Sequence, residues 1–181
     1  MKYIVRKPYW NYEKEEAWLN GKSAQGLALT GYSWCRYEFE DSNKGEYVYR
    51  IELLSHPSSH PESQKYIAFL EDIGIEHVSS YMRWIYLRKK SADGAFDLYS
   101  DIDSKIAHYK KISTLVLTVA GIELGAAALN LSLFIAGGQI FTTNLILGCV
   151  TLAFGILFIG IGLPPLAKLR RLKKERRIRE A

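Results

Sequence analysis

The chain has 181 residues, with 24 Lys and Arg against 19 Asp and Glu, and its mean hydropathy of −0.08 conceals three unlike parts. Residues 1–111 carry 16 basic and 16 acidic side chains, residues 112–163 carry a single charge, and residues 164–181 carry a net charge of +6. Because the overall charge of +5 comes from the tail, the pI of about 9.1 does not indicate a nucleic-acid-binding surface, and we expect no nucleic acid as a partner.

The chain has two cysteines, Cys35 in an expected strand and Cys149 in an apolar helix. They form neither a spaced metal pair nor a disulfide framework, so a reducing compartment is the simplest interpretation. The first residues, MKYIVRKPYW, contain no apolar run of signal-peptide length. We therefore expect no cleavable secretion signal.

The N-terminal part alternates between strand-like and helix-like patterns. Residues 2–7 predict a short strand, and residues 11–26 predict a helix with Asn11 as its N-cap and Gly26 at its end. The glutamates that follow Asn11 suit the first turn of that helix, because its N-terminus carries a partial positive charge.

Two alternating segments come next. Residues 33–40 and 46–53 both place apolar side chains at every second position, on either side of the turn sequence DSNKG, which predicts a β-hairpin. A loop and then a helix follow over residues 56–74. Residues 77–89 predict the last strand. The order β-α-β-β-α-β over residues 1–90 is that of a ferredoxin-like α+β domain, whose sheet carries two helices on one face.

The other face of that sheet is where we expect a partner or ligand to bind. In the last strand, alternation places aromatic or apolar side chains on both faces, so neither face is polar. A second copy of the domain, an extension of the first membrane helix, a partner protein or a flat ligand would each cover the open face. The candidate residues are Trp34, Met82, Trp84 and Tyr86. RNA is not favoured, because it needs basic surroundings that this charge-neutral part lacks.

No catalytic motif is evident. The sequence has no glycine-rich phosphate loop, GxSxG elbow or HExxH motif, so we expect neither enzyme activity nor a cofactor and name no catalytic residue. His56 and His60 are four residues apart, but Pro57 and Pro61 argue against a shared metal-binding helix face. We interpret both histidines as loop residues and predict no metal. The carboxylates fall in first turns of helices or at outward strand positions, which indicates solvated faces.

Residues 91–111 are predicted to form a linker and a juxtamembrane helix. Ser100, with Asp103 three positions later, resembles a capping box at the start of that helix. We expect the helix to run without a break into the first apolar run, which would couple the N-terminal domain mechanically to a membrane.

Two apolar runs predict a transmembrane hairpin. The first covers residues 112–135, which at about 1.5 Å per residue exceeds the ~30 Å core of a bilayer, and the second covers residues 145–163. The uncharged residues 136–144 between them suit a tight turn. The alternative is a buried helix pair in a soluble core, which we disfavour because both runs are apolar all round.

Basic residues flank the hairpin on both sides, and none lies in its turn, so both termini are expected in the cytoplasm. Pro164 and Pro165 end or kink the second span. Leucines three residues apart in the tail, residues 164–181, favour a basic helix on the inner headgroups, with a frayed tail as the alternative. The residues expected to contact lipid headgroups are Lys168, Arg170, Arg171, Lys173, Lys174, Arg176, Arg177 and Arg179.

A single acid, Glu123, interrupts the first span. A charge at the bilayer centre costs about 2.5–3.5 kcal/mol, so Glu123 is expected to be protonated or to face another helix. Gly121 and Gly125 form a small-xxx-small pattern around it, which predicts helix packing at these three residues within the hairpin or in a homodimer. A role in sensing or ion coupling is the alternative. The second span offers four glycines as potential contacts, Gly148, Gly155, Gly160 and Gly162.

Several stretches together resemble a known family. They are EEAWLNGKSAQGLAL (15–29), YEFEDSNKGEYVYRIELL (37–54), YIAFLEDIGIEHV (66–78), RWIYLRKK (83–90) and DGAFDLYSDIDSKIAHYKKI (93–112). They are similar to the bacterial domain of unknown function 2812, whose members carry C-terminal membrane spans and are often encoded beside a PadR-like transcriptional regulator. That family has no established activity. The resemblance implies a regulatory or accessory protein in the cytoplasmic membrane of a Gram-positive bacterium.

These patterns predict a non-enzymatic integral membrane protein whose cytoplasmic domain binds a partner or ligand and relays membrane state to a cytoplasmic regulator. The alternative is an accessory or stabilising subunit of a membrane transporter. A third interpretation, an enzyme that uses the aromatic face as a pocket, would need clustered polar groups on that face.

Overall fold

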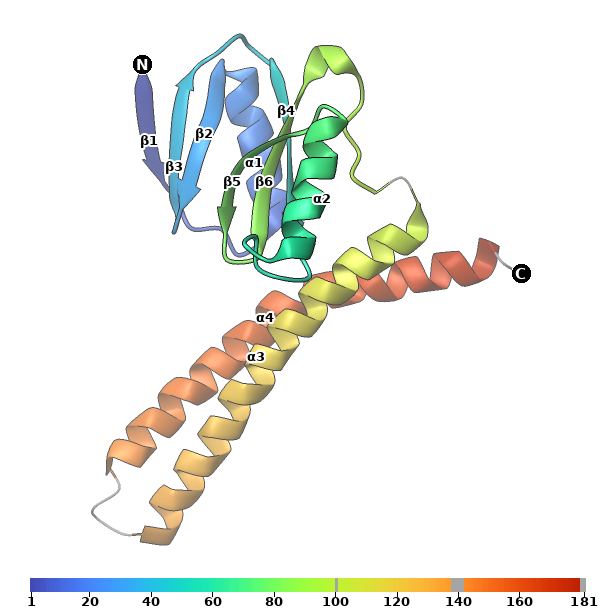
Figure 1. The fold of residues 1–181 in the computed structure, drawn as a ribbon. Helices are drawn as coiled ribbons and strands as arrows, with labels where there is room; N and C mark the ends of the chain where they lie inside the picture. Colours follow the sequence, from blue (N-terminus) through green and yellow to red (C-terminus); the bar gives the residue numbers. More distant parts are fainter. Residues whose placement is uncertain (100, 138–141, 180–181) are drawn as a thin grey trace. The chain divides into compact units, whose positions relative to one another are not determined.

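The computed structural model describes residues 1–99, 101–137 and 142–179 (Figure 1). The chain divides into two compact units, Met1–Ser100 and Asp101–Ala181. The first unit contains strands and helices, and the second is a pair of long helices. The α+β class predicted from the sequence is confirmed.

The strands of the first unit form two antiparallel three-stranded sheets, in the orders β1-β3-β2 and β4-β6-β5. A short 3₁₀ helix, Ser91–Asp93, follows the last strand. In chain order the elements of this unit are β1 (Lys2–Arg6), α1 (Tyr12–Ala24), β2 (Leu27–Ser33), β3 (Arg36–Asp41), β4 (Tyr47–Leu53), α2 (Pro61–Asp72), β5 (Glu76–Tyr81) and β6 (Trp84–Lys90).

The ferredoxin-like order is not confirmed, because the described residues form six strands where the sequence patterns predict four. The patterns do not predict β2, and the single strand predicted over 77–89 is two strands joined by a tight turn. Tyr81 pairs with Trp84, so only Met82 and Arg83 lie in that turn, and Met82 has a φ of 55°. Turns of this kind usually contain glycine, asparagine or aspartate, so methionine gave no signal.

The two sheets are built by the same β-α-β-β arrangement used twice. In each half the first strand pairs with the third and the third pairs with the second. Gly26 and Gly74 occupy equivalent places, between the helix and the next strand, and both have positive φ. This is the conformation that glycine adopts most easily at a helix C-terminus. The first unit is therefore an internal structural repeat in which β2 corresponds to β5.

Side chains close the edge of β2 where the two sheets meet. The Oγ of Ser79 on β5 donates to the carbonyl oxygen of Tyr32 (3.1 Å) and accepts from the N–H of Tyr32 (3.2 Å). The N–H of Leu29 donates to the hydroxyl of Tyr49 (2.8 Å), and its carbonyl oxygen accepts from Arg88 (3.2 Å). Side chains thus satisfy backbone groups of β2 that a further strand would otherwise pair.

α1 covers the free edge of β4 in the same way. Glu16, Asn20 and Ser23 lie along one face of the helix. They accept hydrogen bonds from the N–H groups of Ile51 (3.0 Å), Tyr49 (2.8 Å) and Tyr47 (3.2 Å) respectively. Asn20 and Ser23 also donate to the carbonyl oxygens of Tyr49 and Tyr47. A strand edge covered by a helix is protected from pairing with other chains.

Replacing Asn20 by Leu should therefore destabilise the protein by about 1–3 kcal/mol. The N–H of Tyr49, a fully buried residue, would lose its acceptor, at about 1–3 kcal/mol for a buried group, while the carbonyl oxygen of Tyr49 keeps the hydrogen bond that Arg50 donates at 3.0 Å. Urea denaturation of the protein in detergent, followed by tryptophan fluorescence, measures the change. Gly21→Ala is the matched control, because an added Cβ there meets no atom within 4 Å. Equal stability of the Asn20 variant and the wild type would contradict the role of Asn20.

Two buried clusters lie on opposite faces of β6. On one face Tyr86 packs in a cluster with Leu19 of α1, and on the other Ile85 and Leu87 pack with Ile67 of α2. Alternation along the strand explains this division. The two helices therefore cover opposite faces of the second sheet, whereas the ferredoxin-like prediction places both on one face.

The second unit consists of α3 (Ile102–Gly137) and α4 (Thr142–Arg179), each long and apolar enough to cross a membrane. α3 passes without a break from the predicted juxtamembrane helix into the first apolar run. Asp101 caps it, accepting from the N–H of Ser104 at 2.7 Å. The cap predicted at Ser100 lies outside the described residues, and so do residues 138–141 of the predicted turn.

α3 and α4 pack through a repeat of seven residues. Glycines on α4 make room for leucines on α3. A Cβ added to Gly148, Gly155 or Gly162 would lie 2.8 Å from Leu131, 2.7 Å from Leu124 or 3.1 Å from Leu117 respectively. A contact that returns every seven residues keeps the same two helix faces together along the hairpin.

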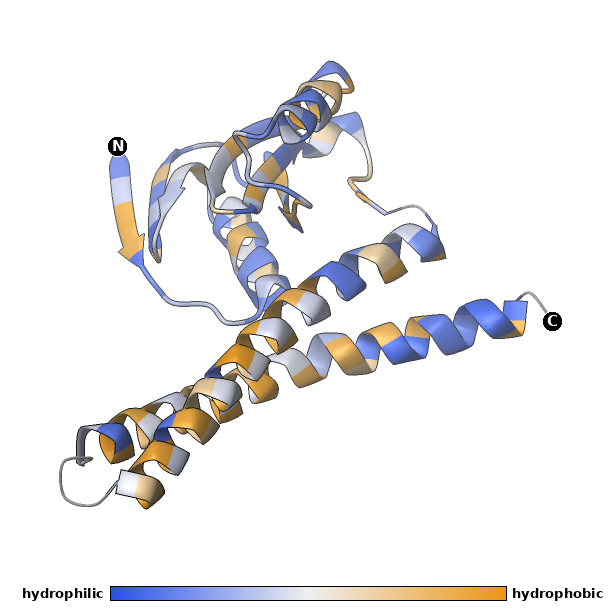
Figure 2. Ribbon diagram, turned by 60° about the horizontal axis from the view of Figure 1, so that its bottom comes forward, coloured by the Kyte–Doolittle hydropathy of each residue, from blue (hydrophilic) through white to orange (hydrophobic). Residues whose placement is uncertain are grey.

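Pro164 and Pro165 lie inside α4 and do not end it. Figure 1 shows α4 bending between its apolar part and its basic part. A proline removes a helical hydrogen bond and crowds the preceding turn, which explains the bend. Figure 2 shows the hairpin as hydrophobic and the last part of α4 as hydrophilic. The predicted helical continuation of the tail is thus confirmed as far as Arg179.

Candidate ligand-binding site

The four residues of the predicted aromatic face lie in two places. Trp34 and Met82 are at the tips of two hairpins, 74% and 73% exposed, and both have positive φ. Tyr86 is buried, and Trp84 is half-buried with its ring centroid 5.7 Å from that of Tyr12. Their predicted role in binding a partner or ligand stays a prediction, but they do not form one surface.

Tyr86 faces a glutamate that the sequence patterns group with the solvated carboxylates. Glu15 of α1 is only 7% exposed. Its Oε1 accepts hydrogen bonds from the hydroxyls of Tyr37 on β3 and Tyr86 on β6, both at 2.7 Å. Because the two tyrosines come from different sheets, one carboxylate oxygen links both sheets to α1.

Aromatic rings surround this carboxylate. The ring of Tyr32 on β2 lies 4.8 Å from that of Tyr37 and 4.5 Å from that of Tyr86, measured between centroids. Trp18, almost one turn further along α1, packs edge-on against Tyr37 at 4.8 Å. We use the name Glu15 cluster for Glu15 together with Tyr12, Trp18, Tyr32, Tyr37, Trp84 and Tyr86.

The charge of Glu15 has no counterpart within the described part of the chain. No lysine, arginine or histidine among the described residues pairs with Glu15, and no described residue donates a hydrogen bond to its Oε2. Burial raises the pKa of the Glu15 carboxyl, while the hydrogen bonds from Tyr86 and Tyr37 lower it. The next residue, Glu16, does have a cation, because Arg50 lies 3.3 Å away.

The two tyrosines act as donors. Burial raises the pKa of both Tyr37 and Tyr86, and the nearby Glu15 raises it further, so their hydroxyls keep their protons. The cluster is thus a preorganised acceptor: two fixed donors hold one oxygen of the carboxylate, and the other oxygen accepts no hydrogen bond from the part of the chain that the structure describes. Such a group can accept a cation or another hydrogen-bond donor.

Glu15 is the residue that sequence reasoning missed. A signal existed, because Tyr12 and Leu19 lie on the same helix face and Leu19 is fully buried. A glutamate in the first turn is equally explained by the helix dipole, so the pattern alone favours a solvated side chain. Glu52 is a second exception, since it is buried and accepts from the hydroxyl of Tyr66 at 2.9 Å.

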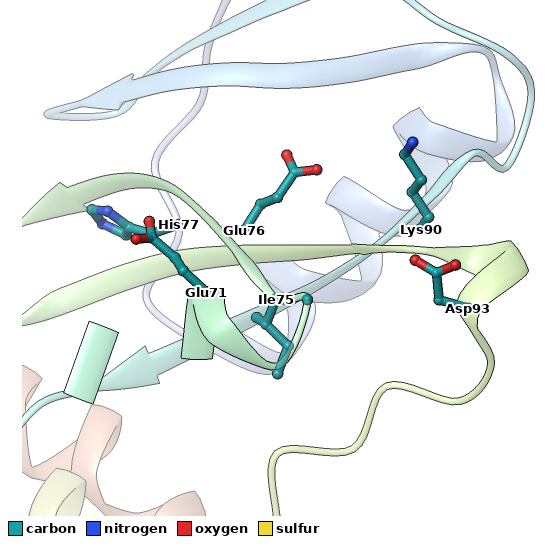
Figure 3. Close-up of a pocket in the computed structure, with 7 residues that line it drawn as sticks. Glu71, Ile75, Glu76, His77, Lys90 and Asp93 are labelled. Carbon is teal, nitrogen blue, oxygen red and sulfur yellow. The ribbon is translucent and has the colours of Figure 1, made fainter. Parts of the chain in front are cut away.

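A second candidate is an open cavity of about 550 Å³ beside β5 (Figure 3). It is lined by Glu71, Gly74, Ile75, Glu76, His77, Lys90 and Asp93. Its charged side chains have both signs, and Glu76 is already paired with Arg88 at 2.7 Å. The lining includes neither a tyrosine or tryptophan ring nor a buried charge, so the Glu15 cluster is the better candidate.

Two of the three predicted packing residues of the first span, Gly121 and Gly125, do not meet α4. A Cβ added to Gly121 or Gly125 meets no atom within 4 Å, and Glu123 is half-buried. The contacts inside the hairpin come from the glycines of α4 at 148, 155 and 162 instead. Packing at Gly121, Glu123 and Gly125 against another chain stays a prediction.

The basic tail is mostly exposed, and three of its side chains have partners in the second unit. Arg176 pairs with Asp103 at 2.9 Å, and Arg179 pairs with Glu175 at 2.6 Å. The Nζ of Lys168 lies 5.0 Å from the centre of the Tyr109 ring. The contacts of Arg176 and Lys168 join the tail to the first part of α3, whereas the Arg179–Glu175 pair lies within the tail. Contact of the tail with lipid headgroups stays a prediction.

A family model described as a protein of unknown function (DUF2812) matches residues 11–120. The matched segment contains every residue of the Glu15 cluster and the first part of α3. No curated protein and no solved structure matches the chain.

Proposed function

The chain belongs to the family of proteins of unknown function DUF2812, so its role must come from its own geometry, and we propose that it is a membrane-anchored sensory protein whose first unit binds a positively charged ligand at the Glu15 cluster. The observation that carries the proposal is the buried Glu15 carboxylate without a cation among the described residues. Binding is relayed to a cytoplasmic regulator, and the protein is not an enzyme.

The electrostatics of the Glu15 cluster favour an organic cation. A buried carboxylate without a counter-ion is costly, so a ligand that brings a positive charge recovers free energy that the protein alone does not. The faces of tyrosine and tryptophan rings attract cations as well. A cation with apolar substituents would use both interactions, whereas a small hydrated ion would use only the first.

Access to the cluster is proposed from the side of Tyr12 and Trp84. Both rings are half-buried, while Tyr37 and Tyr86 are buried. The outer rings pack against each other across α1 and β6, with 5.7 Å between their centroids. Rotation of two surface side chains is a smaller change than opening either sheet.

The membrane part of the proposal rests on α3 and α4. Both are long and apolar enough to span a bilayer, and basic residues flank the hairpin on both sides. In line with the positive-inside rule, the proposal has the hairpin in the cytoplasmic membrane of a bacterium with both termini in the cytoplasm. α3 begins at Ile102 and continues into the apolar run, so it offers a direct mechanical path between a binding event and the membrane.

The proposal is tested by calorimetric titration of the full-length protein in detergent with aromatic quaternary ammonium ions such as benzyltrimethylammonium. We expect saturable binding that weakens at least about tenfold in Glu15→Gln, because the amide removes the charge and keeps an acceptor for both tyrosines. Glu71→Gln, an exposed residue of α2, is the matched control. Binding that is absent from the wild type, or equal in the wild type and Glu15→Gln, would overturn the proposal.

A second function, an accessory subunit of a membrane transporter, is favoured by one observation. Gly121 and Gly125 leave a face of α3 without contacts to α4, and small residues allow another helix to approach closely. Replacing both glycines by Leu should release a larger membrane protein that co-purifies with the wild type. Co-purification that survives the double replacement would count against this alternative.

A further inference from the structure

The segment between β4 and α2 brings together side chains that ligate metals. Its sequence is HPSSHPE, residues 56–62. Neither His56 nor His60 lies inside α2, so the expectation that no helix face carries both histidines is met. The loop nevertheless stacks their rings, with centroids 4.2 Å apart and planes 20° from parallel.

Glu62 completes a set of three ligands. Its Oε2 lies 3.4 Å from the Nε2 of His56, and ligand atoms of His56, His60 and Glu62 all lie within 4.8 Å of one another. Two donor atoms on a tetrahedral zinc ion are about 3.4 Å apart, as bond lengths of about 2.0–2.2 Å require. Small rotations of these surface side chains close the remaining distance.

Several contacts hold the loop in this shape. Each histidine precedes a proline, which restricts it to extended conformations, and His60 has φ −70° and ψ 141°. The N–H of His60 donates to the carbonyl oxygen of Pro57 at 2.9 Å, and the hydroxyl of Ser63 donates to the carbonyl oxygen of His56 at 3.3 Å. A ligand set fixed by its loop loses little entropy on binding a metal.

From this geometry we propose that His56, His60 and Glu62 bind a divalent transition-metal ion of the zinc type. Two imidazoles and one carboxylate are a donor set that suits zinc and its neighbours, and not magnesium or calcium, which prefer oxygen ligands throughout. Three protein ligands leave one position open to water or to a donor from a partner. This site uses no residue of the Glu15 cluster, so the metal-binding proposal is independent of the proposed function and is tested separately.

His60 has a second role, which sharpens the test. It is the N-cap of α2, and its Nδ1 accepts from the N–H of Glu62 at 3.3 Å. A neutral imidazole has one acceptor nitrogen, so a metal on Nε2 requires the proton to sit on Nδ1, which can then no longer accept from the helix. Metal binding and helix capping therefore exclude each other at His60.

The test uses untagged full-length protein in detergent, stripped of metal with a chelator. We expect calorimetric titration with Zn²⁺ to give one ion per chain and a rise in Tm, because binding favours the folded state. Co²⁺ in place of Zn²⁺ should give a visible spectrum without the thiolate charge-transfer band that binding at Cys35 or Cys149 would produce.

Two variants remove ligand atoms and keep the structural role of each residue. His60→Asn retains an N-cap, since Asn is among the best capping residues, and His56→Phe retains a stacked ring. Each should weaken Zn²⁺ binding at least about tenfold, because loss even of groups that only support a ligand costs about 10–100-fold. Unchanged Tm values of the metal-free variants would show that folding is intact.

His77→Asn on β5 is the matched control and should bind Zn²⁺ as the wild type does. Equal affinity in His60→Asn and His77→Asn would overturn the proposal, and so would the lack of a one-to-one endpoint with the wild type. A thiolate band in the Co²⁺ spectrum would place the metal at a cysteine and would overturn it as well.

Discussion

Replacing Glu15 by Leu should lower the free energy of unfolding by about 2–4 kcal/mol, whereas replacing it by Gln should leave that free energy unchanged or raise it at neutral pH. Leu leaves the hydroxyls of Tyr37 and Tyr86 without an acceptor, at about 1–3 kcal/mol for each buried group, and removal of the desolvated carboxylate offsets part of that loss. The carbonyl oxygen of Gln can accept from both hydroxyls, as Oε1 of Glu15 does.

The pH dependence of stability separates the effect of the buried carboxylate charge from the effect of losing the hydrogen-bond acceptor. Burial raises the pKa of Glu15 in the folded protein above its ordinary value of about 4.5. The folded state then holds this proton more tightly than the unfolded chain does. Stability from this group is therefore greatest below the unfolded pKa and falls as the pH rises from there to the folded pKa. Each unit between the two values corresponds to about 1.4 kcal/mol.

Urea denaturation of the wild type and Glu15→Gln across pH 4 to 8 measures this contribution as the difference between the two curves. The comparison is needed because burial also raises the pKa of Glu16, which contributes with the same sign in both proteins. We expect the wild type to lose stability relative to Glu15→Gln as the pH rises. A difference that stays constant with pH would show that Glu15 does not titrate in a buried environment.

Sequence patterns predicted those parts of the fold that have local causes. Asn11 caps α1, and Pro61 begins α2, as the patterns indicate. The two apolar runs predict two long helices, and α3 and α4 are long and apolar enough to cross a membrane. These features depend only on a few neighbours in the chain.

The features that the patterns missed depend on contacts between distant residues. Asn20 and Ser23 read as ordinary polar helix residues until β4 lies beside them. The sequence predicts Glu15 as a solvated acid in the first turn of a helix, and only the fold brings the hydroxyls of Tyr37 and Tyr86 to it from two sheets. The turn at Met82 contains no glycine that would indicate a turn, so the sequence pattern predicts one long strand in place of two short strands. Tertiary hydrogen bonds set the positions of Asn20, Ser23 and Glu15, and a single sequence does not display such bonds.

The first apolar run shows the same limit in the second unit. Small-xxx-small spacing drew attention to Gly121 and Gly125, although these two do not meet α4. The glycines that do meet α3 are seven residues apart, a spacing that becomes informative only with the leucines opposite them. The face that a helix uses for packing depends on the side chains of its partner helix as well as on its own.

Gly155→Ala should destabilise the hairpin by about 1–3 kcal/mol relative to Gly160→Ala on the same helix. The added methyl group of the first variant would lie 2.7 Å from the side chain of Leu124 and 3.4 Å from its backbone nitrogen, so the helices must separate or Leu124 must change rotamer. At Gly160 the same methyl group meets no atom within 4 Å. Both variants gain the higher helix propensity of alanine, and the difference between them isolates the packing of α3 against α4.

SDS denaturation of the protein in mixed micelles measures this difference. Energy transfer between dyes on Cys149 and on an introduced Ala128→Cys, in a Cys35→Ser background, reports separation of the two helices. We expect Gly148→Ala to behave like Gly155→Ala, because its added methyl group would lie 2.8 Å from Leu131. Gly121→Ala should behave like Gly160→Ala if the outer face of α3 meets lipid only. A stability of Gly121→Ala that departs from that of Gly160→Ala as the protein concentration rises would indicate another result. The small-residue face of α3 would then be the contact between two copies of the chain.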